Sequence, residues 1–327
     1  MRIGIMSLIV SLAVALLMCG CGSKEPAVES DQELTGELII FHAGSLSVPF
    51  ADVSKAFKEK YPKVDVKAEA AGSRDTARKV SDLGRPCDVL GSADYKVVEN
   101  LLMPDHADFN IRFATNELAI VYTDESKYHD QITAENWPEI LLRDDVAFGR
   151  ADPNRDPCGY RTVMVFQLAE KHYKMPGLAE KLAKKGGNKY IRPKETDLLA
   201  LLEAGEIDYL FIYRSVGEQH DLNVLRLPDE VNLKSPDFED LYNTAKIEVT
   251  GKKPGEMIEQ TGSAIVYSVT IPKNAENRKA AEAYVAFLLS PEGRAIMEKN
   301  GQSVIAPAIV DHFDNLPAEL KEYCKQE

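Results

Sequence analysis

The sequence predicts an α/β protein built from two α/β units, and three features of its pattern indicate this. Residues 37–94 alternate short apolar stretches with amphipathic segments in the order strand, helix, strand, helix, strand. That order is typical of a parallel sheet covered by helices. Residues 146–213 form a second such unit, and residues 261–290 lead back as a strand and a helix. A chain of 327 residues is long enough for two domains of about 150 residues each.

The first unit begins with a buried strand over residues 37–42. Ser45 then stands where a helix cap belongs, and apolar residues follow at helical spacing until Tyr61-Pro62 ends the helix. Residues 63–70 alternate as a second strand. Ser73 is expected to cap a helix over residues 74–82, before a third short strand within CDVLGSAD.

The second unit follows a strand in FATNELAIVYTDES that leads out of the first unit. WPEILL is predicted as a short helix and VAFG as a strand. The loop DPNRDPCG then launches a long helix at Tyr160 or Arg161. Residues 207–213 are apolar on both faces, as a strand buried in a parallel sheet would be. After the return strand ends at Pro272, helices are expected over about 277–290 and from Ser290-Pro291.

The N-terminal segment is predicted to be a targeting sequence. Arg2 precedes an unbroken apolar run over residues 3–18, which is shorter than the ~20 residues that a spanning helix needs. Residues 1–20 are therefore interpreted as a signal peptide. The small residue directly before Cys21 resembles a lipobox, so Cys21 is expected to carry a lipid, with residues 21–36 as a flexible tether. A signal anchor or a simple cleavage remains the alternative.

Composition and charge exclude several classes of function. The formal net charge of −13 argues against nucleic acid and anionic membranes as partners, so an anionic ligand has to be held by local dipoles. Cys87, Cys158 and Cys324 form no CxxC pair, and the six histidines show no ligand spacing. The chain has no GxSxG, HExxH, P-loop or GxGxxG motif. Cys158 at a helix start is a conceivable nucleophile, but no base accompanies it.

Four predicted helix starts follow strand ends and carry polar groups. HAGSL and AAGSR match each other, because each places a glycine and a serine between a strand and a helix. DPCGYR and IRPKETDLL supply two more, and Tyr213 ends the next strand. Helix starts favour negative charge, and parallel strands bring such ends to one edge of a sheet. These four could surround one small anion, or they could be ordinary helix caps that need no ligand.

The sequence resembles the archaeal molybdate/tungstate-binding proteins of ABC transporters. The resemblance is carried by the lipoprotein-type leader together with five stretches: AGSL, AGSRDTARKV, DPNRDPCGYRT, IRPKETDLLALLEAGEIDYLFIY and SAIVYSVTIPK. The resemblance covers about residues 37–325. It implies a two-lobed periplasmic-binding-protein-like fold of type II, each lobe a mostly parallel sheet covered by helices. Lobe 1 would hold residues 37–121 and 267–327 and lobe 2 residues 122–266, with crossovers near Val121-Tyr122 and Val266-Tyr267.

The resemblance also implies the ligand contacts, which come from both lobes: Gly44, Ser45 and Ser73 from lobe 1, and Asp156, Pro157, Cys158, Glu195 and Tyr213 from lobe 2. Asp156 and Glu195 would bond to the molybdenum or tungsten of the oxyanion. Glu218 is a competing acidic candidate, but it lies past the strand that ends at Tyr213, away from the helix starts.

The function that follows from the resemblance is capture of molybdate or tungstate outside the cytoplasm and delivery to an ABC transporter permease. The protein would be a monomer without enzymatic activity or cofactor, held at the outer face of the cell membrane by its lipid alone. Two alternatives remain open at this point. One is a carrier for another oxyanion, such as sulfate or phosphate; the other is a lipid-anchored extracytoplasmic hydrolase that uses Cys158 or a pair of acids not identified in the sequence.

Overall fold

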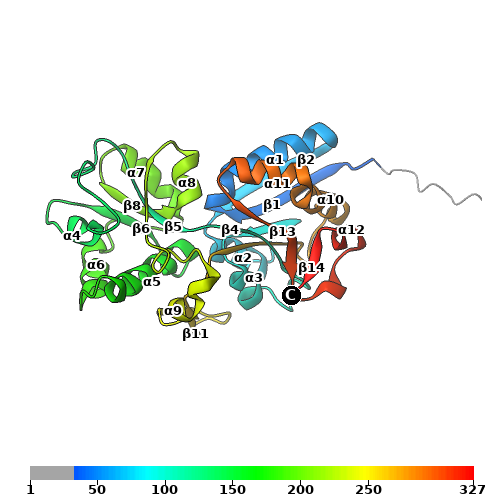
Figure 1. Ribbon diagram of the computed structural model, residues 1–327. Coiled ribbons are helices and arrows are strands. Elements are labelled where there is room, and N and C mark those ends of the chain that lie inside the picture. The colour runs from blue at the N-terminus through cyan, green and yellow to red at the C-terminus, as the bar shows by residue number, and fades with distance from the viewer. Residues whose placement is uncertain (1–32) are drawn as a thin grey trace, which may run out of the picture. The chain divides into compact units, whose positions relative to one another are not determined.

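A computed structural model describes residues 33–327, and these residues form two lobes, each centred on one β-sheet (Figure 1). The predicted signal peptide, Cys21 and nearly all of the predicted tether lie outside the described residues. Within residues 33–327, no helix combines the length and the apolar character needed to cross a membrane.

The first lobe contains a seven-stranded sheet in the order β14-β13-β4-β12-β3-β1-β2. Its strands are β1 (Gly36–Ala43), β2 (Val64–Ala71), β3 (Val89–Ser92), β4 (Ile111–Thr115), β12 (Val266–Thr270), β13 (Ser303–Val310) and β14 (Cys324–Gln326). Figure 1 shows α1, α10 and α11 on one side of this sheet and α2 and α3 on the other. The helices of the lobe are α1 (Ser47–Lys60), α2 (Ser73–Ser81), α3 (Tyr95–Leu101), α10 (Arg278–Leu289), α11 (Pro291–Lys299) and α12 (Ala318–Lys321), with 3-10 turns η1 (Gly44–Leu46) and η4 (Phe313–Asn315).

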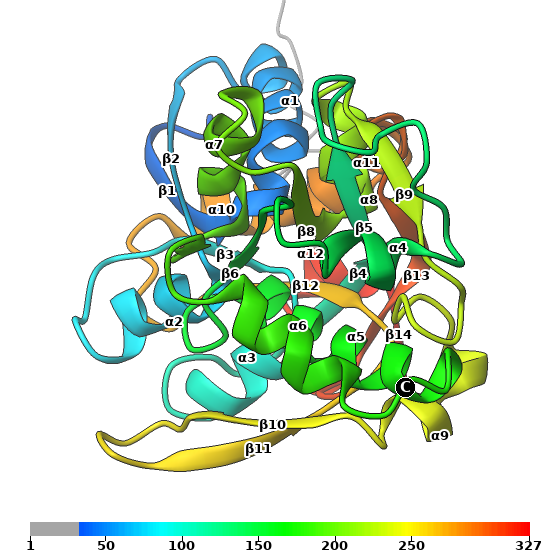
Figure 2. The same ribbon diagram turned by 90° about the vertical axis from the view of Figure 1, so that its left-hand side faces the viewer.

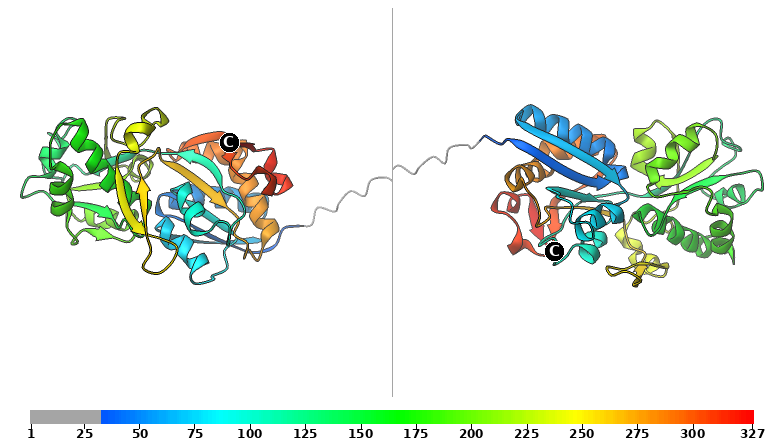
Figure 3. Two further views of the ribbon diagram at one scale, coloured as in Figure 1. Left: turned by 90° about the horizontal axis from the view of Figure 1, so that it is seen from below. Right: turned by 180° about the vertical axis from the view of Figure 1, so that it is seen from behind.

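The second lobe contains a five-stranded sheet in the order β7-β6-β8-β5-β9. Its strands are β5 (Leu118–Tyr122), β6 (Phe148–Ala151), β7 (Ile191–Arg192), β8 (Tyr209–Tyr213) and β9 (Asn223–Arg226). The helices are α4 (Trp137–Leu141), α5 (Pro157–His172), α6 (Leu178–Gly186), α7 (Leu199–Glu203), α8 (Arg214–Gln219) and α9 (Glu239–Tyr242), with 3-10 turns η2 (Glu195–Leu198) and η3 (Pro236–Phe238). Figure 3 shows the two lobes from two further directions.

Both sheets are mixed rather than mostly parallel. The predicted parallel βαβαβ unit is confirmed, because β1 pairs in parallel with both β2 and β3. The first strand after each crossing runs the other way: β5 is antiparallel to β8 and β9, and β12 is antiparallel to β3 and β4. Each of these strands enters its sheet directly from the other lobe, and it runs opposite to its two neighbours in that sheet.

The first crossing lies earlier in the chain than the sequence predicts. The stretch expected to hold one strand contains two, with β4 in the first sheet and β5 in the second. The chain therefore crosses at Asn116-Glu117 and not at Val121-Tyr122. The return crossing immediately precedes β12, at about the expected place. The apolar run over 118–122 gives no sign of this in the sequence, because a strand buried in either sheet has the same composition.

Aromatic side chains fill the core of each lobe. In the second lobe, Phe211 on β8 contacts Trp137, Phe148 and Phe166 edge to face, with ring centroids 5.1–5.7 Å apart. In the first lobe, Tyr284 on α10 packs in the same way against aromatic rings of α1. Each lobe therefore has an apolar core of its own. The polar loops between the lobes are not part of either core, so they can form a binding site.

A two-stranded ribbon formed by β10 (Lys246–Thr250) and β11 (Met257–Thr261) runs below the lobes in Figure 2. Its base is attached to α5, because the Gln167 amide exchanges two hydrogen bonds with the Lys246 backbone. Its far end reaches α2 of the first lobe, where Arg78 donates to the Gly251 carbonyl over 2.6 Å. The ribbon therefore connects helices that belong to different lobes.

Candidate functional site

The two matching glycine–serine turns lie side by side at one edge of the first sheet. β1 and β2 run in parallel with Ala43 opposite Ala71, so Gly44 and Gly72 leave the sheet together. The sequence predicts that Ser45 and Ser73 cap helices, and this is wrong for both. Ser45 lies within η1, and Ser73 is the first residue of α2; neither helix start has a side-chain cap. Both serines are buried, and each hydroxyl group accepts a hydrogen bond from a residue distant in the chain.

The glycines of these turns allow the second lobe to approach. A methyl group on Gly44 would lie 2.8 Å from Oε2 of Glu195, and one on Gly72 would lie 2.3 Å from the Arg155 carbonyl oxygen. Real β-carbons essentially never show contacts this short. Neither glycine has a left-handed backbone, so close approach, and not backbone freedom, requires glycine at both positions.

Asp156 joins the two loops of the second lobe. It is the N-cap of α5, which begins at Pro157 and not at Tyr160 or Arg161 as predicted. One carboxylate oxygen accepts a hydrogen bond from the Cys158 amide (2.8 Å), and the other accepts one from the Glu195 amide (3.1 Å). Pro157 suits the first helical position because it has no N–H to satisfy there. The carboxylate is buried and fixes the two loops relative to each other.

Glu195 is the least satisfied group in the site. Its side chain is 1% exposed, and neither carboxylate oxygen has a hydrogen-bond partner among the described residues. Burial and the neighbouring Asp156 carboxyl raise the pKa of Glu195 well above its ordinary value. Burial raises the pKa of Asp156 as well. Burial without a partner disfavours the charged form of Glu195, so ionisation of this carboxyl requires a positive charge nearby, which the groups of residues 33–327 do not supply.

Tyr213 ends β8 beside these loops, as the sequence predicts. β6 pairs in parallel with both β7 and β8, so Asp156, Glu195 and Tyr213 follow three neighbouring strands at the same edge. The Tyr213 hydroxyl is buried and accepts a hydrogen bond from Arg161 Nη1 over 2.8 Å. The three second-lobe side chains therefore converge opposite the two serine turns of the first lobe.

Arg161 and Asp94 connect the lobes, and sequence reasoning did not select either residue. Arg161 on α5 pairs with Asp94 at 3.0 Å and donates to the Ala93 carbonyl at 2.7 Å. Both side chains are buried, and Asp94 is also the N-cap of α3. Asp75 and Arg155 add a more exposed pair at 2.6 Å. The only signal for Arg161 was its place in DPCGYR, since an ion pair 67 positions apart leaves no local pattern.

The remaining candidates lie in different surroundings. Cys158 is buried with its thiol directed at the Phe211 carbonyl, and burial raises the pKa of the thiol well above its ordinary value. A thiol held in this way is a poor nucleophile, which removes the main support for the hydrolase alternative.

Glu218 pairs with Arg214 and lines a cavity of about 410 Å³, and none of the predicted ligand residues lines this cavity. Within residues 33–327, no three metal-binding side chains gather as an ion site.

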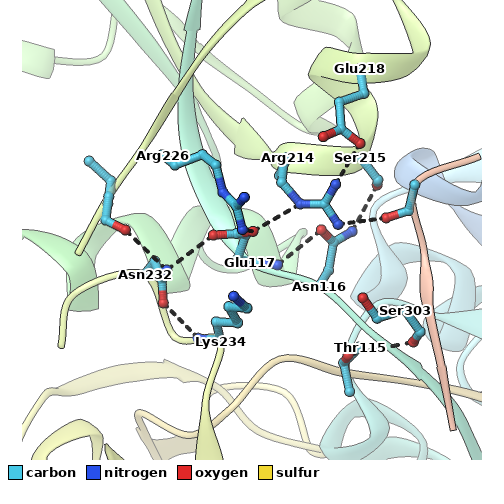
Figure 4. Close-up of polar contacts among 12 residues, drawn as sticks. Thr115, Asn116, Glu117, Arg214, Ser215, Glu218, Arg226, Asn232, Lys234 and Ser303 are labelled. Carbon is cyan, nitrogen blue, oxygen red and sulfur yellow. Dashed lines mark hydrogen bonds and ion pairs between the residues drawn. The ribbon is translucent and has the colours of Figure 1, made fainter. Parts of the chain in front are cut away.

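Glu117, at the first crossing, is bonded to residues of the second lobe (Figure 4). Glu117 is buried and accepts hydrogen bonds from Arg226 (2.7 Å) and Asn232 (3.1 Å), and it pairs with Arg214 (2.9 Å). Asn116, one residue earlier, donates instead to Tyr267 on the return strand β12 over 3.2 Å. The two crossing segments are thus linked directly behind the site.

Two sheets joined by two crossings, with polar loops converging between them, define a two-lobed binding protein with the type II periplasmic fold. A family model described as "Bacterial extracellular solute-binding protein" matches residues 38–302. The chain belongs to this family of solute-binding proteins. The predicted fold class is confirmed.

Known proteins resemble the chain over almost its whole length. An uncharacterized solute-binding protein of Petrotoga mobilis is 54% identical over 90% of this chain and 92% of its own. The molybdate/tungstate-binding protein WtpA of Pyrococcus abyssi is 43% identical over 98% of both chains. Among solved structures, the periplasmic molybdate-binding protein of Azotobacter vinelandii matches 82% of this chain and 99% of its own, with a TM-score of 0.60 and 16% identity. That last likeness concerns the fold alone.

Proposed function

We propose that the protein captures molybdate or tungstate between its lobes and delivers it to an ABC importer. The family, the relative from Pyrococcus abyssi and the fold of the protein from Azotobacter vinelandii support this role. The ligand residues are those predicted from the sequence: Gly44, Ser45, Ser73, Asp156, Pro157, Cys158, Glu195 and Tyr213. The protein acts as a carrier and not as an enzyme, and it uses no cofactor.

The observation that carries the proposal is the pair of buried acids. Asp156 and Glu195 are both buried at the meeting point of the lobes, and neither Glu195 oxygen has a hydrogen-bond partner within residues 33–327. Most oxyanion sites would avoid such groups because they repel a dianion. Molybdenum(VI) and tungsten(VI) are hard Lewis acids that can expand from four oxygen ligands to six. Two carboxylate oxygens are suitable fifth and sixth ligands.

Electrostatics favours bonds to the metal over simple contact with the oxyanion. At ~4 Å and an effective dielectric constant of ~20, two unit charges repel by about 4 kcal/mol. The start of a helix stabilises a nearby negative charge by only ~0.3–1 kcal/mol, or up to ~2 kcal/mol when partly buried. The attraction of a dianion to the starts of α2 and α5 is therefore weaker than its repulsion from two carboxylates. Direct coordination removes the conflict for molybdate and tungstate, whereas sulfate and phosphate cannot expand and remain repelled.

Isothermal titration calorimetry with the purified body, residues 33–327, tests this function. Molybdate and tungstate are titrated separately and then in competition, with sulfate and phosphate as matched controls. We expect binding of the first two and no measurable heat from the controls. A tungstate concentration of 100 times Kd should also add about 2.7 kcal/mol to the free energy of unfolding. Tight binding of sulfate or phosphate in preference to both metal oxyanions would contradict the proposal.

Location follows from the family, whose members act outside the cytoplasm. We further propose that Cys21 carries a lipid that holds the protein, as a monomer, at the outer face of the cell membrane. The support is the leader sequence that ends in Met18-Cys19-Gly20-Cys21. Mass spectrometry of the N-terminal peptide from cells should find lipidated Cys21. A mature chain that begins downstream of Cys21 would contradict the anchor without affecting the binding site.

A further inference from the structure

Three hydroxyl groups at the site share one arrangement: each accepts a hydrogen bond from a donor behind it. Ser45 Oγ accepts from the Tyr267 hydroxyl (2.9 Å), and Ser73 Oγ accepts from the Ala93 amide (3.0 Å). Tyr213 accepts from Arg161. Among the described residues, none of the three hydroxyl hydrogens has an acceptor of its own. A hydroxyl group donates once, so each hydrogen remains free for a ligand.

The donor behind Ser45 belongs to a chain whose direction is fixed at its far end. The Glu117 amide donates to Asn116 Oδ1 over 2.9 Å, and this orients the Asn116 side chain. Asn116 Nδ2 then donates to Ser215 (2.8 Å; Figure 4) and to the Tyr267 hydroxyl (3.2 Å). An amide nitrogen can only donate, so the Tyr267 oxygen accepts, and the Tyr267 hydrogen is directed to Ser45.

We propose that Tyr267 is a positioning residue, which through Asn116 forces the Ser45 hydroxyl to donate to the bound oxyanion. This inference rests on the proposed function and adds residues that contact no ligand themselves. Tyr267 is fully buried and lies on the return strand β12, so it fixes Ser45 from within the same lobe. The orientation exists before the ligand arrives, and preorganised donors lose less freedom on binding.

The arrangement also defines the chemical class of the ligand. Ser45, Ser73 and Tyr213 offer three donors, so they suit an oxyanion that carries no hydrogen and can only accept. Each of the three oxygen atoms already accepts one hydrogen bond, so the group has one remaining acceptor position and one free hydrogen for the ligand. The donor set and the two acids thus act on different properties of the ligand: the donors favour an oxyanion whose oxygen atoms accept hydrogen bonds, and the acids select a metal centre that can bind further oxygens.

A double-mutant cycle in tungstate affinity tests the inference. The proteins are wild type, Tyr267→Phe, Ser45→Ala and the double variant, measured by calorimetry. Tyr267→Phe should raise Kd about 3- to 10-fold, the range expected for one hydrogen bond. In the Ser45→Ala background the same change should alter Kd less than about twofold, because the hydroxyl that Tyr267 orients is gone.

Tyr284→Phe is the matched control. Tyr284 is also fully buried in the first lobe, and its hydroxyl bonds to Ser54 of α1 in place of a site residue. It should leave Kd unchanged while its effect on thermal unfolding matches that of Tyr267→Phe. An unchanged Kd for Tyr267→Phe, an equal factor in both backgrounds, or an equal effect of Tyr284→Phe would overturn the inference. Absence of tungstate binding by wild type would instead contradict the proposed function itself.

Discussion

Gly44 allows the closest test of how the lobes meet. A methyl group there would lie 2.8 Å from Glu195 Oε2, 2.8 Å from Lys194 Cγ and 2.9 Å from Thr196 Oγ1. Ordinary van der Waals contact begins at 3.4 Å. Gly44→Ala therefore displaces the side chains of Lys194, Glu195 and Thr196 at the start of η2 by roughly half an ångström.

The displacement falls on Glu195, so we expect it to weaken ligand binding strongly. A misplacement of about 1 Å at a reacting group costs up to ~10²-fold, and Gly44→Ala should raise Kd for tungstate roughly 10- to 100-fold. The free energy of unfolding of the ligand-free protein should change by no more than about 0.5 kcal/mol, because the clash arises only when the lobes meet.

Gly186→Ala provides the control, since its methyl group would lie 2.9 Å from the Phe148 ring within the second lobe. This variant should lose about 1–3 kcal/mol of unfolding free energy in urea denaturation and keep its tungstate affinity. The reasoning fails if Gly44→Ala binds tungstate as tightly as wild type by calorimetry. It also fails if Gly44→Ala loses stability in the absence of ligand to the same extent as Gly186→Ala.

Three further predictions follow from the site and its surroundings. Asp156→Asn and Glu195→Gln keep the shape of each side chain but remove its charge; each should weaken tungstate at least about 10-fold and relax the rejection of sulfate, as measured by competition calorimetry. Solution X-ray scattering should show compaction when tungstate is added, because the site is complete only when both lobes contribute; identical curves would indicate a rigid, preformed pocket. Burial and the Asp311 carboxyl raise the pKa of Glu99 to about 7, so the folded state keeps a proton that the unfolded state loses above pH ~4.5. The free energy of unfolding should therefore fall as the pH rises from about 4.5 to 7, and Glu99→Gln should flatten that slope; equal slopes in urea titrations of both proteins would refute this assignment.

Much of the fold could be predicted because its signals are local. The strand before Ser45, the end of the first helix at Tyr61-Pro62 and the helix start at Ser290-Pro291 are all encoded by adjacent residues. The crossing at Asn116-Glu117 is not, because the strands on either side have the same apolar composition and only the pairing of whole sheets separates them.

The sequence selects candidate site residues, but it does not show which residues form hydrogen bonds with them. A serine at a helix start looks the same in sequence whether it caps that helix or serves a ligand, and Ser45 and Ser73 turned out not to cap. The partners that orient these groups, such as Tyr267 and Ala93, are distant in the chain. Arg161 illustrates the same limit, because its partner Asp94 belongs to the other lobe.

X-ray absorption at the tungsten edge of the tungstate-bound protein tests the central claim most directly. The account predicts six oxygen ligands, four at short distance from the oxyanion itself and two at longer distance from Asp156 and Glu195. The two longer ligands should disappear in the double variant Asp156→Asn with Glu195→Gln. Four short oxygens alone in the wild-type complex would contradict coordination by the carboxylates, and with it the reason given for burying two acids in an oxyanion site.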